Sequence, residues 1–437
     1  MLRGMRATIL LCACALVAIG ASSAARPPVR TTNANERALM TVNYKCFDPT
    51  HGADTLCVGP RVLAGGQFWP YGTNYTNILQ GQGLMTYDTN EGIMRLLICD
   101  GNDQDKTKVM KLDVLAGSQV GKSIDVSEYI TSIVLVGVGQ YIEKDLGNRK
   151  TYISGFNVKD IQNRHIPIRH SFFEIHHKTD EVKDMGFSAE SLLGEHTKHN
   201  LLNVLGGKIS AFDEDKKVFW QLMARNNTDK VPSGQNEFFL WGANMEKKSL
   251  ENIYTFPRGD CIMVSGGMTW DDKKKKIIFP LHNSAKEMGV GEFDPYTGDC
   301  KQRAKVDSPS PFGNVGSINA YDPDKRTFAG FVLATPPPSE SEEPEYEIYR
   351  DEELDVAFVS HPHLHANPTP MPGPSGEAGA AWLAELASME ARQLNQQGEM
   401  FNAYEYSIDT GNVDEITWSA SIGIKDLPMQ VAYMWNR

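Results

Sequence analysis

One short phrase, in which a glycine and small residues lead to an aromatic residue and then an aspartate, occurs four times in this chain. The copies are GLMTYD, GKISAFD, GMTWD and GSINAYD, and they end at Asp88, Asp213, Asp271 and Asp322. Three copies run on into a charged turn and an apolar stretch, in EDKKVFW, DKKKKIIF and PDKRTFAGF. That order predicts a strand, a tight turn and a second strand. Recurrence every 50 to 60 residues or so, or about double that, indicates a repeat architecture.

A second phrase marks another turn. It reads FDPYTG at 293–298, SIDTG at 407–411, IHHKTD at 175–180 and FDPTHG at 47–52. Two alternating turns of this kind are typical of the four-stranded antiparallel blades of a β-propeller, whose strands we call a to d from the axis outward. The first phrase ends strand a, and the second joins strand c to strand d. We therefore expect the repeated aspartates to be turn residues rather than calcium ligands.

The spacing predicts an all-β fold, a six-bladed propeller over residues 38–437, with seven blades as the alternative. Five full blades are expected at 80–126, 130–188, 204–257, 260–307 and 313–418, the second of them built on strands at 132–138 and 152–156. Residues 38–57 would supply strands c and d of the sixth blade, and residues 419–437 its strands a and b. Such pairing of the N-terminal strands with the C-terminal blade would close the ring and remove its open edges.

The N-terminus predicts a secretory signal peptide at residues 1–25. Arg3 and Arg6 precede the apolar stretch 7–20, and small residues follow at 21–25. An uncleaved anchor is the alternative, but the apolar stretch is shorter than the 20 or so residues that a membrane span needs. No second stretch of this kind exists. We expect a secreted protein, extracellular or in the lumen of the secretory pathway, with no membrane span in the mature chain.

The fifth blade carries an expected insertion at 336–398, rich in Pro, Glu and His. Its opening, PPPSESEE at 336–343, is too polar and charged to offset the entropy of ordering. Residues 378–397 are rich in Ala, Leu and Glu and predict a helix. The insertion is therefore expected to be partly disordered and partly helical.

Charge and cysteine content limit the possible partners and crosslinks. The net charge of −12, from 55 acidic and 43 basic residues, argues against nucleic-acid binding. Five of the seven cysteines lie beyond the signal peptide, so at least one thiol has no partner within the chain. Cys46 and Cys57 flank a hairpin and could form one disulfide, and Cys261 and Cys300 could form another. Asn74 and Asn226 lie in glycosylation sequons, which a eukaryotic secretory pathway would use.

Histidines give the one metal-like pattern. His361, His363 and His365 alternate, so that on an extended chain their imidazoles point the same way and could bind one divalent metal such as Zn²⁺ or Cu²⁺. The alternative is a polar loop whose histidines have no common role. No other cofactor is predicted. His165, His170, His176 and His177 in the second blade are expected to be surface residues, and the sequence contains no nucleophile elbow, HExxH helix or Walker A motif.

The phrases AFDEDKKVFW, AYDPDKRTFAGF and GEFDPYTGDC resemble the degenerate blades of the broad YVTN and quinoprotein-dehydrogenase-like propeller superfamily. The resemblance covers nearly all of residues 38–437 except the insertion. The blades lack the repeated WD dipeptide and Gly-His pattern of WD40 repeats, since the one WD dipeptide is at 270–271. Members of this group include binding scaffolds, redox enzymes and metal-dependent lactonases, so the resemblance implies a fold and assigns no residue a role.

We expect a binding or interaction protein, a monomer and not an enzyme, whose protein or other extracellular ligand meets the face formed by the d–a and b–c connections. Candidate ligand-binding residues near the axis or on the connection 59–79 are Trp69, Gln82, Ser265, Asn314 and Asn319. The alternative is a metal-assisted hydrolase or lactonase with acidic and amide ligands in the central channel. That alternative requires side chains from at least three blades to converge on one point.

Overall fold

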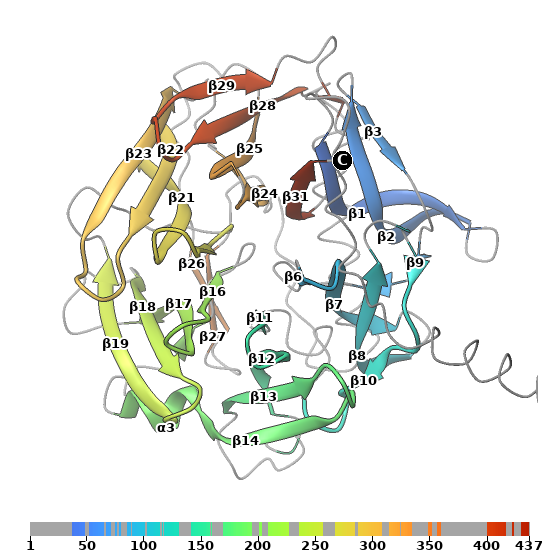
Figure 1. Ribbon diagram of the computed structural model, residues 1–437, viewed down its shortest axis with the longest axis vertical. Helices are drawn as coiled ribbons and strands as arrows, with labels where there is room; N and C mark the ends of the chain where they lie inside the picture. Colours follow the sequence, from blue (N-terminus) through green and yellow to red (C-terminus); the bar gives the residue numbers. More distant parts are fainter. Residues whose placement is uncertain are drawn as a thin grey trace, which may run out of the picture.

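The structure of the chain is a computed structural model in which sheets surround a central axis (Figure 1). It describes residues 37–48, 52–64, 67–70, 75–76, 78–79, 85–88, 90–100, 103–113, 116, 118–130, 141–157, 159, 169–194, 201–202, 209–226, 236–256, 267–284, 287–307, 314–323, 325–333, 348–351, 356–359, 400–416, 422–423 and 430–436. Within these ranges no helix has the length and apolar character needed to cross a membrane. The expected signal peptide and the expected helix at 378–397 lie outside them.

The first two sheets follow the chain in order. The first contains β5 (Ile78–Leu79), β6 (Met85–Asp88), β7 (Ile93–Asp100), β8 (Asp103–Asp113), β9 (Ser118–Gln119) and β10 (Ile124–Asp125). The second contains β11 (Tyr141–Asp145), β12 (Lys150–Phe156), β13 (His170–His176) and β14 (Val182–Ser188), and is followed by the short helix α3 (Ala189–Leu193). Neighbouring strands in both sheets pair antiparallel, as a meander requires.

The next two sheets repeat this plan. The third contains β15 (Leu201–Leu202), β16 (Ser210–Asp213), β17 (Val218–Asn226), β18 (Asn236–Asn244) and β19 (Ser249–Phe256). The fourth contains β20 (Thr269–Asp271), β21 (Lys276–Ser284), β22 (Glu287–Phe293) and β23 (Cys300–Asp307). Strands β6, β11, β16 and β20 contact one another in sequence around the axis, so they are the inner strands of their sheets (Figure 1).

The fifth sheet has ten strands and contains both ends of the described chain. Its strands are β24 (Asn314–Asp322), β25 (Thr327–Leu333), β28 (Met400–Ser407), β29 (Val413–Ile416), β30 (Ile422–Gly423), β31 (Gln430–Asn436), β1 (Arg37–Asp48), β2 (Gly52–Ala64), β3 (Gln67–Pro70) and β4 (Tyr75–Thr76). Strand β31 pairs antiparallel with β1 and parallel with β24, where Ile318 lies opposite Val431. A separate hairpin, β26 (Ile348–Asp351) and β27 (Val356–Val359), lies within the expected insertion.

The propeller has five blades, so the prediction of six, with seven as the alternative, is wrong. The cause is the position of β31: because it pairs with β24, the strands assigned to a sixth blade belong to the same sheet as the fifth. The C-terminus supplies one strand beside β1 rather than the expected two. Closure of the whole ring stays a prediction.

The second blade begins on a different strand from the one predicted. Its inner strand is β11, which ends at Asp145, whereas the predicted strand at 132–138 lies outside the described residues. Asp145 and the positive φ of 52° at Arg149 give this blade the same four-residue turn as the other copies. The sequence YIEKD had hidden this turn because no glycine and aromatic pair stands directly before its aspartate.

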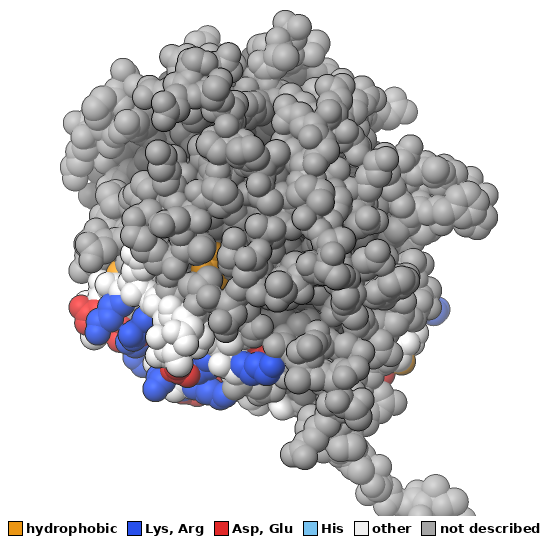
Figure 2. Space-filling view, turned by 90° about the horizontal axis from the view of Figure 1, so that it is seen from above, with side chains coloured by type: hydrophobic (Ala, Val, Ile, Leu, Met, Phe, Trp, Pro, Cys, Tyr) orange, Lys and Arg blue, Asp and Glu red, His pale blue; other side chains and the backbone are white. Residues whose placement is uncertain are grey.

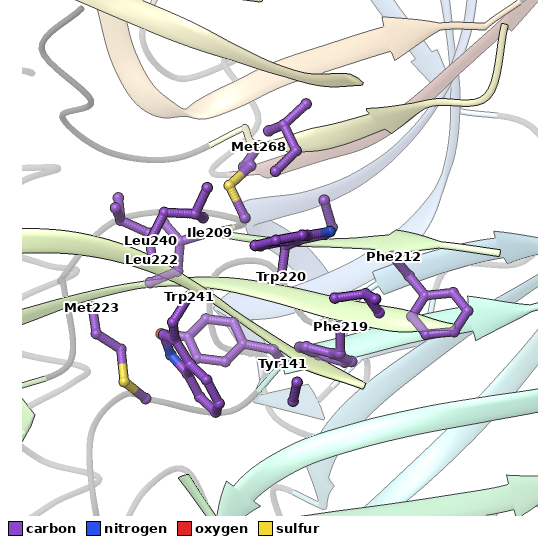
Figure 3. Close-up of a cluster of buried hydrophobic side chains, with 14 of the residues drawn as sticks. Tyr141, Ile209, Phe212, Phe219, Trp220, Leu222, Met223, Leu240, Trp241 and Met268 are labelled. Atoms are coloured by element: carbon purple, nitrogen blue, oxygen red, sulfur yellow. The ribbon is translucent and has the colours of Figure 1, made fainter. Parts of the chain in front are cut away.

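The largest core cluster joins the second, third and fourth sheets (Figure 3). Consecutive residues of β17, including Phe219, Trp220 and Leu222, are fully or almost fully buried, so both faces of this sheet are covered by its neighbours. Phe172 of β13 packs its ring edge-on against Phe219 at 5.6 Å and Trp241 at 6.0 Å between centroids. Aromatic contacts between sheets therefore hold the blades side by side.

The closest packing lies opposite Trp220. Gly242 of β18 pairs with Trp220 across the ladder, and a Cβ on Gly242 would lie 2.7 Å from the Trp220 ring and 2.8 Å from Val218. We predict that Gly242→Ala lowers the free energy of unfolding by about 1–3 kcal/mol, because neither buried neighbour has room to move. Chemical denaturation followed by tryptophan fluorescence measures this. Gly147→Ala is the control, since its Cβ would meet only the flexible end of Lys217, at 3.3 Å, and the Asp145 carboxylate at 3.6 Å.

Candidate functional site

In each of the five sheets one strand ends at an aspartate that closes a four-residue turn. These residues, Asp88, Asp145, Asp213, Asp271 and Asp322, are each 2% exposed or less. One carboxylate oxygen accepts backbone amide hydrogens of the turn, as Oδ1 of Asp88 does from Asn90 at 2.9 Å and from Glu91 at 3.0 Å. The last turn residue has a positive φ, from 52° at Arg149 to 68° at Gly92. The repeated aspartates are thus turn residues, as the sequence predicts.

Several of these aspartates also bond to the next sheet. Asp145 accepts a hydrogen bond from Lys217 of the third sheet at 2.7 Å. Asp213 accepts one from the Tyr296 hydroxyl of the fourth sheet, and the Lys216 ammonium lies 3.0 Å from the centre of the Tyr296 ring. A buried carboxylate without such partners would strongly destabilise the fold. The same side chain therefore closes its own turn and aligns the neighbouring blade.

Arg326 makes the corresponding link between the fourth and fifth sheets. Its side chain is 5% exposed, and its Nε donates to Asp271 at 2.7 Å. It also contacts Glu292 at 3.4 Å and forms an ion pair with Asp409. Glu292 is buried too, but hydrogen bonds from Arg303 and Lys276 lower the pKa of its carboxyl. This network is the most extensive buried set of ion pairs in the described part of the chain.

The inner strands of the second and third sheets meet through polar contacts. Ser210 donates to Glu143 at 2.7 Å, and both side chains are buried. At the turn end of these strands Glu214 accepts a hydrogen bond from the Leu146 amide at 3.2 Å. Burial raises the pKa of Glu214, as does repulsion from Asp272 and Asp145, and the positive charge of Lys144 opposes the rise. Burial likewise raises the pKa of Asp272.

One group of three side chains has the composition of a metal site. Asp88 and Glu91 of the β6–β7 turn and His177 of the β13–β14 turn place a carboxylate or ring atom each within 4.8 Å of one another. His177 Nδ1 lies 3.6 Å from Asp88 Oδ2, and both side chains are almost fully buried. Among the described residues it is the one such group of three or more metal-ligating side chains, and its members come from two sheets.

Two arginines neutralise the carboxylates of this group. Arg95 contacts Asp88 at 3.4 Å and Glu91 at 3.0 Å, and Arg149 contacts Glu91 at 2.8 Å. Partial burial works against ionisation of Glu91, but hydrogen bonds from Arg149 and Arg95 lower its pKa. Burial and the charge of Arg95 lower the pKa of His177 to about 4, so its imidazole is neutral at neutral pH.

Three of the five candidate ligand-binding residues lie on described strands, and their role stays a prediction. Asn314 and Asn319 lie on β24, and Trp69 lies on β3. These strands are four positions apart in the ten-stranded sheet, a separation of about 19 Å at the usual strand spacing. Gln82 and Ser265 lie outside the described residues, as does the predicted metal triplet His361, His363 and His365.

The predicted disulfides and glycosylation sites stay predictions. Cys46 and Cys57 lie on the paired strands β1 and β2, where Cys46 is opposite Thr55 and Cys57 is opposite Asn43. Cys300 begins β23, and Cys261 lies outside the described residues. Asn226 ends β17, and Asn74 is not described.

The expectation of surface histidines in the second blade is wrong for two of them. His170 is 1% exposed, and its Nδ1 lies 3.0 Å from the Ser154 hydroxyl. The side chain of His177 is 1% exposed, and its Nε2 lies 2.9 Å from the Thr151 hydroxyl. Both histidines face a neighbouring strand or sheet rather than solvent. The sequence gives no sign that His170 and His177 are buried, because the burial of both side chains depends on neighbouring strands and on the adjacent blade.

Comparison with known proteins adds no family. No protein-family model matches the chain, and no curated protein matches its sequence. Similar solved structures include TolB from Acinetobacter baumannii, with 10% identity, a TM-score of 0.38, and coverage of 68% of this chain and 60% of TolB. The β-propeller domain of the Trilobed protease from Pyrococcus furiosus has 12% identity, a TM-score of 0.35, and coverage of 69% and 87%. The Dos1 propeller has 9% identity, a TM-score of 0.33, and coverage of 67% and 70%. Similarity at this level carries no argument about function.

Arg326→Met tests the link between the fourth and fifth sheets. It leaves Asp271 and Glu292 buried without this partner, so we predict a loss of about 3–5 kcal/mol in the free energy of unfolding. Lys275→Met is a matched control at the equivalent turn position, where φ is 56° against 53° at Arg326. Its ion pair with Asp215 joins side chains that are 44% and 65% exposed, so the change is expected to stay within about 1 kcal/mol. Equal losses of unfolding free energy in the two variants would show that the buried Arg326 ion pairs stabilise the fold no more than an exposed ion pair does.

Glu214→Gln tests the cost of burying the Glu214 carboxylate at the turn between β16 and β17. The raised pKa means that the folded protein holds this proton more tightly than the unfolded chain, so stability falls as pH rises through the folded pKa. We predict that at pH 7 the variant has a higher Tm than the wild type, and a free energy of unfolding that is higher by less than about 1 kcal/mol. Below about pH 4, where the wild-type carboxyl is protonated, the two proteins should be equally stable. Thermal denaturation at both pH values measures this, with the exposed Glu246→Gln as control. A variant less stable at pH 7 would contradict it.

Proposed function

We propose that the protein is a propeller scaffold that binds a protein or other extracellular ligand at the face formed by the d–a and b–c connections. The observation that carries this proposal is that the longest connections between the described strands all lie at this face. Strand direction alternates within each blade, so the a–b and c–d turns share one face and the b–c and d–a connections share the other.

The first face consists of short turns. Residues 89–92, 146–149, 214–217, 272–275 and 323–326 each join two strands through four residues that are tied to a buried aspartate. Basic and acidic side chains lie close together there, as in the ion pair of Lys275 with Asp215, and the coloured part of Figure 2 likewise shows basic and acidic side chains interspersed. These side chains are already engaged with the turns and with neighbouring blades.

The opposite face receives connections of very different length, from two residues at 101–102 and 285–286 to the long ones that follow. The chain between β12 and β13 covers 157–169, that between β17 and β18 covers 227–235, and that between β19 and β20 covers 257–268. The expected insertion also leaves the fifth sheet at this face, between β25 and β28. Connecting loops on a rigid scaffold are where binding residues are most often found.

Two candidate residues fit this face. Asn314 is the first residue of β24, at the end opposite the turn that follows Asp322. Trp69 lies on β3, which begins directly after the two-residue connection from β2 at the same face. A tryptophan and an asparagine on strands four positions apart in one sheet would suit a ligand that spans part of the face.

The proposal also includes secretion after removal of residues 1–25, closure of the ring by the chain ends, and membership of the YVTN and quinoprotein-dehydrogenase-like superfamily. N-terminal sequencing of the exported protein tests the first. The alternative of a metal-assisted hydrolase or lactonase has no supporting observation, because the one metal-like group among the described residues lies between two blades at the turn face.

The binding face can be tested with immobilised full-length protein and a panel of secreted proteins and glycans. We predict that Trp69→Ala and Asn314→Ala each weaken capture of a bound ligand at least about fivefold, because interface anchors of this kind contribute 1 kcal/mol or more. The double variant Lys273→Ala/Lys274→Ala on the turn face is the control and should bind as the wild type does. Loss of binding only in the control variant would place the ligand on the wrong face for this proposal.

A further inference from the structure

We propose that Asp88, Glu91 and His177 form a site for one divalent transition-metal ion, with Zn²⁺ as its probe, between the first and second blades. The site differs from the predicted histidine triplet and from the proposed ligand-binding face. Its ligands would be one imidazole nitrogen and two carboxylate oxygens, a set that zinc accepts in proteins. Water would complete the coordination.

The spacing of the ligand atoms fits a shared ion. Two ligands bound tetrahedrally at about 2.1 Å from zinc lie about 3.4 Å from each other. Nδ1 of His177 and Oδ2 of Asp88 are 3.6 Å apart, and a carboxylate oxygen of Glu91 lies within 4.8 Å of both. The pair is too far apart for a hydrogen bond between ring and carboxylate, yet close enough for one ion to contact both atoms.

His177 is oriented as a metal ligand. Its Nε2 lies 2.9 Å from the Thr151 hydroxyl, which fixes the ring as partners of metal-bound histidines do. Its Nδ1 has no hydrogen-bond partner, although the side chain is 1% exposed. When Nε2 carries the proton, the lone pair of Nδ1 points toward two carboxylates. A buried ring nitrogen in this position is unfavourable without a cation, and a bound metal would satisfy it.

The nearby arginines determine how tightly an ion could bind. Arg95 is 4% exposed and stays beside both Asp88 and Glu91, whereas the side chain of Arg149 is 63% exposed and reaches Glu91 from the surface. An incoming ion would replace Arg149 as the partner of Glu91. The proposal therefore predicts competition: removal of the Arg149 charge should strengthen metal binding rather than weaken it.

Zn²⁺ titration of the full-length protein by calorimetry tests the site. The background is His361→Ala/His363→Ala/His365→Ala, so that the predicted triplet contributes no ion. We expect one Zn²⁺ per chain, binding about two- to fivefold tighter in Arg149→Ala, because an exposed ion pair contributes up to about this factor. Glu91→Gln should weaken binding at least tenfold, since it removes an accessible ligand, and His177→Ala should abolish it.

The controls separate this site from adventitious binding. His176→Ala changes the neighbouring histidine, which lies outside the group, and should leave the Zn²⁺ stoichiometry and affinity unchanged. Circular dichroism confirms that each variant is folded, and Glu91→Gln still tests the proposal if His177→Ala fails to fold. The proposal is wrong if the background protein binds no Zn²⁺, or if Glu91→Gln and Arg149→Ala bind it as the background does.

Discussion

The turn aspartates place a nearly fully buried carboxylate at one end of each blade, and the rest of the propeller is arranged to satisfy it. One oxygen takes the amide hydrogens of its own turn. At Asp213 and Asp271 the other oxygen takes a donor from the next blade, and at Asp145 the same oxygen takes both. Buried charge is costly unless it is both hydrogen-bonded and paired. A blade displaced along the axis would lose that pairing, so the aspartates fix the height of each blade relative to its neighbour. The aromatic core between blades then packs against surfaces whose positions are already set.

The contacts between blades share this plan but differ in chemistry. Asp145 meets an ammonium, Asp213 meets a phenol, and Asp271 meets a guanidinium. At Asp88 the neighbouring blade offers an imidazole instead, and the guanidinium comes from the same blade. An ammonium and a guanidinium only donate, whereas a phenol and an imidazole can also accept, and of these four partners only the imidazole offers a nitrogen lone pair. The boundary between the first and second blades is therefore the one of these four with a nitrogen ligand for a metal ion.

Much of the fold could be predicted from sequence because turn chemistry is local. A strand that ends in an aromatic residue and an aspartate before a short charged turn is visible in a single phrase. All four copies lead into strand pairs that the structure contains. The copy at Asp145 was missed since the residue directly before its aspartate is Lys144 rather than an aromatic residue. The blade count failed for a different reason: it depends on whether β31 pairs with β24, a contact between residues more than a hundred positions apart. The burial of His170 and His177, and hence the Asp88–Glu91–His177 group, depends on the adjacent blade and has no local signature.

The fifth sheet has a consequence for the order in which the molecule can be assembled. Strands β1 and β2 are made first, but β31, the neighbour of β1 on the other side, lies at the end of the chain. Until β31 is available, the edge of β1 that it covers is unpaired. The second, third and fourth sheets, in contrast, can form from contiguous sequence. Contacts between distant chain segments slow folding, so formation of this sheet would be the late step. Until it forms, the open edge of β1 is the part of the molecule most exposed to pairing with another chain.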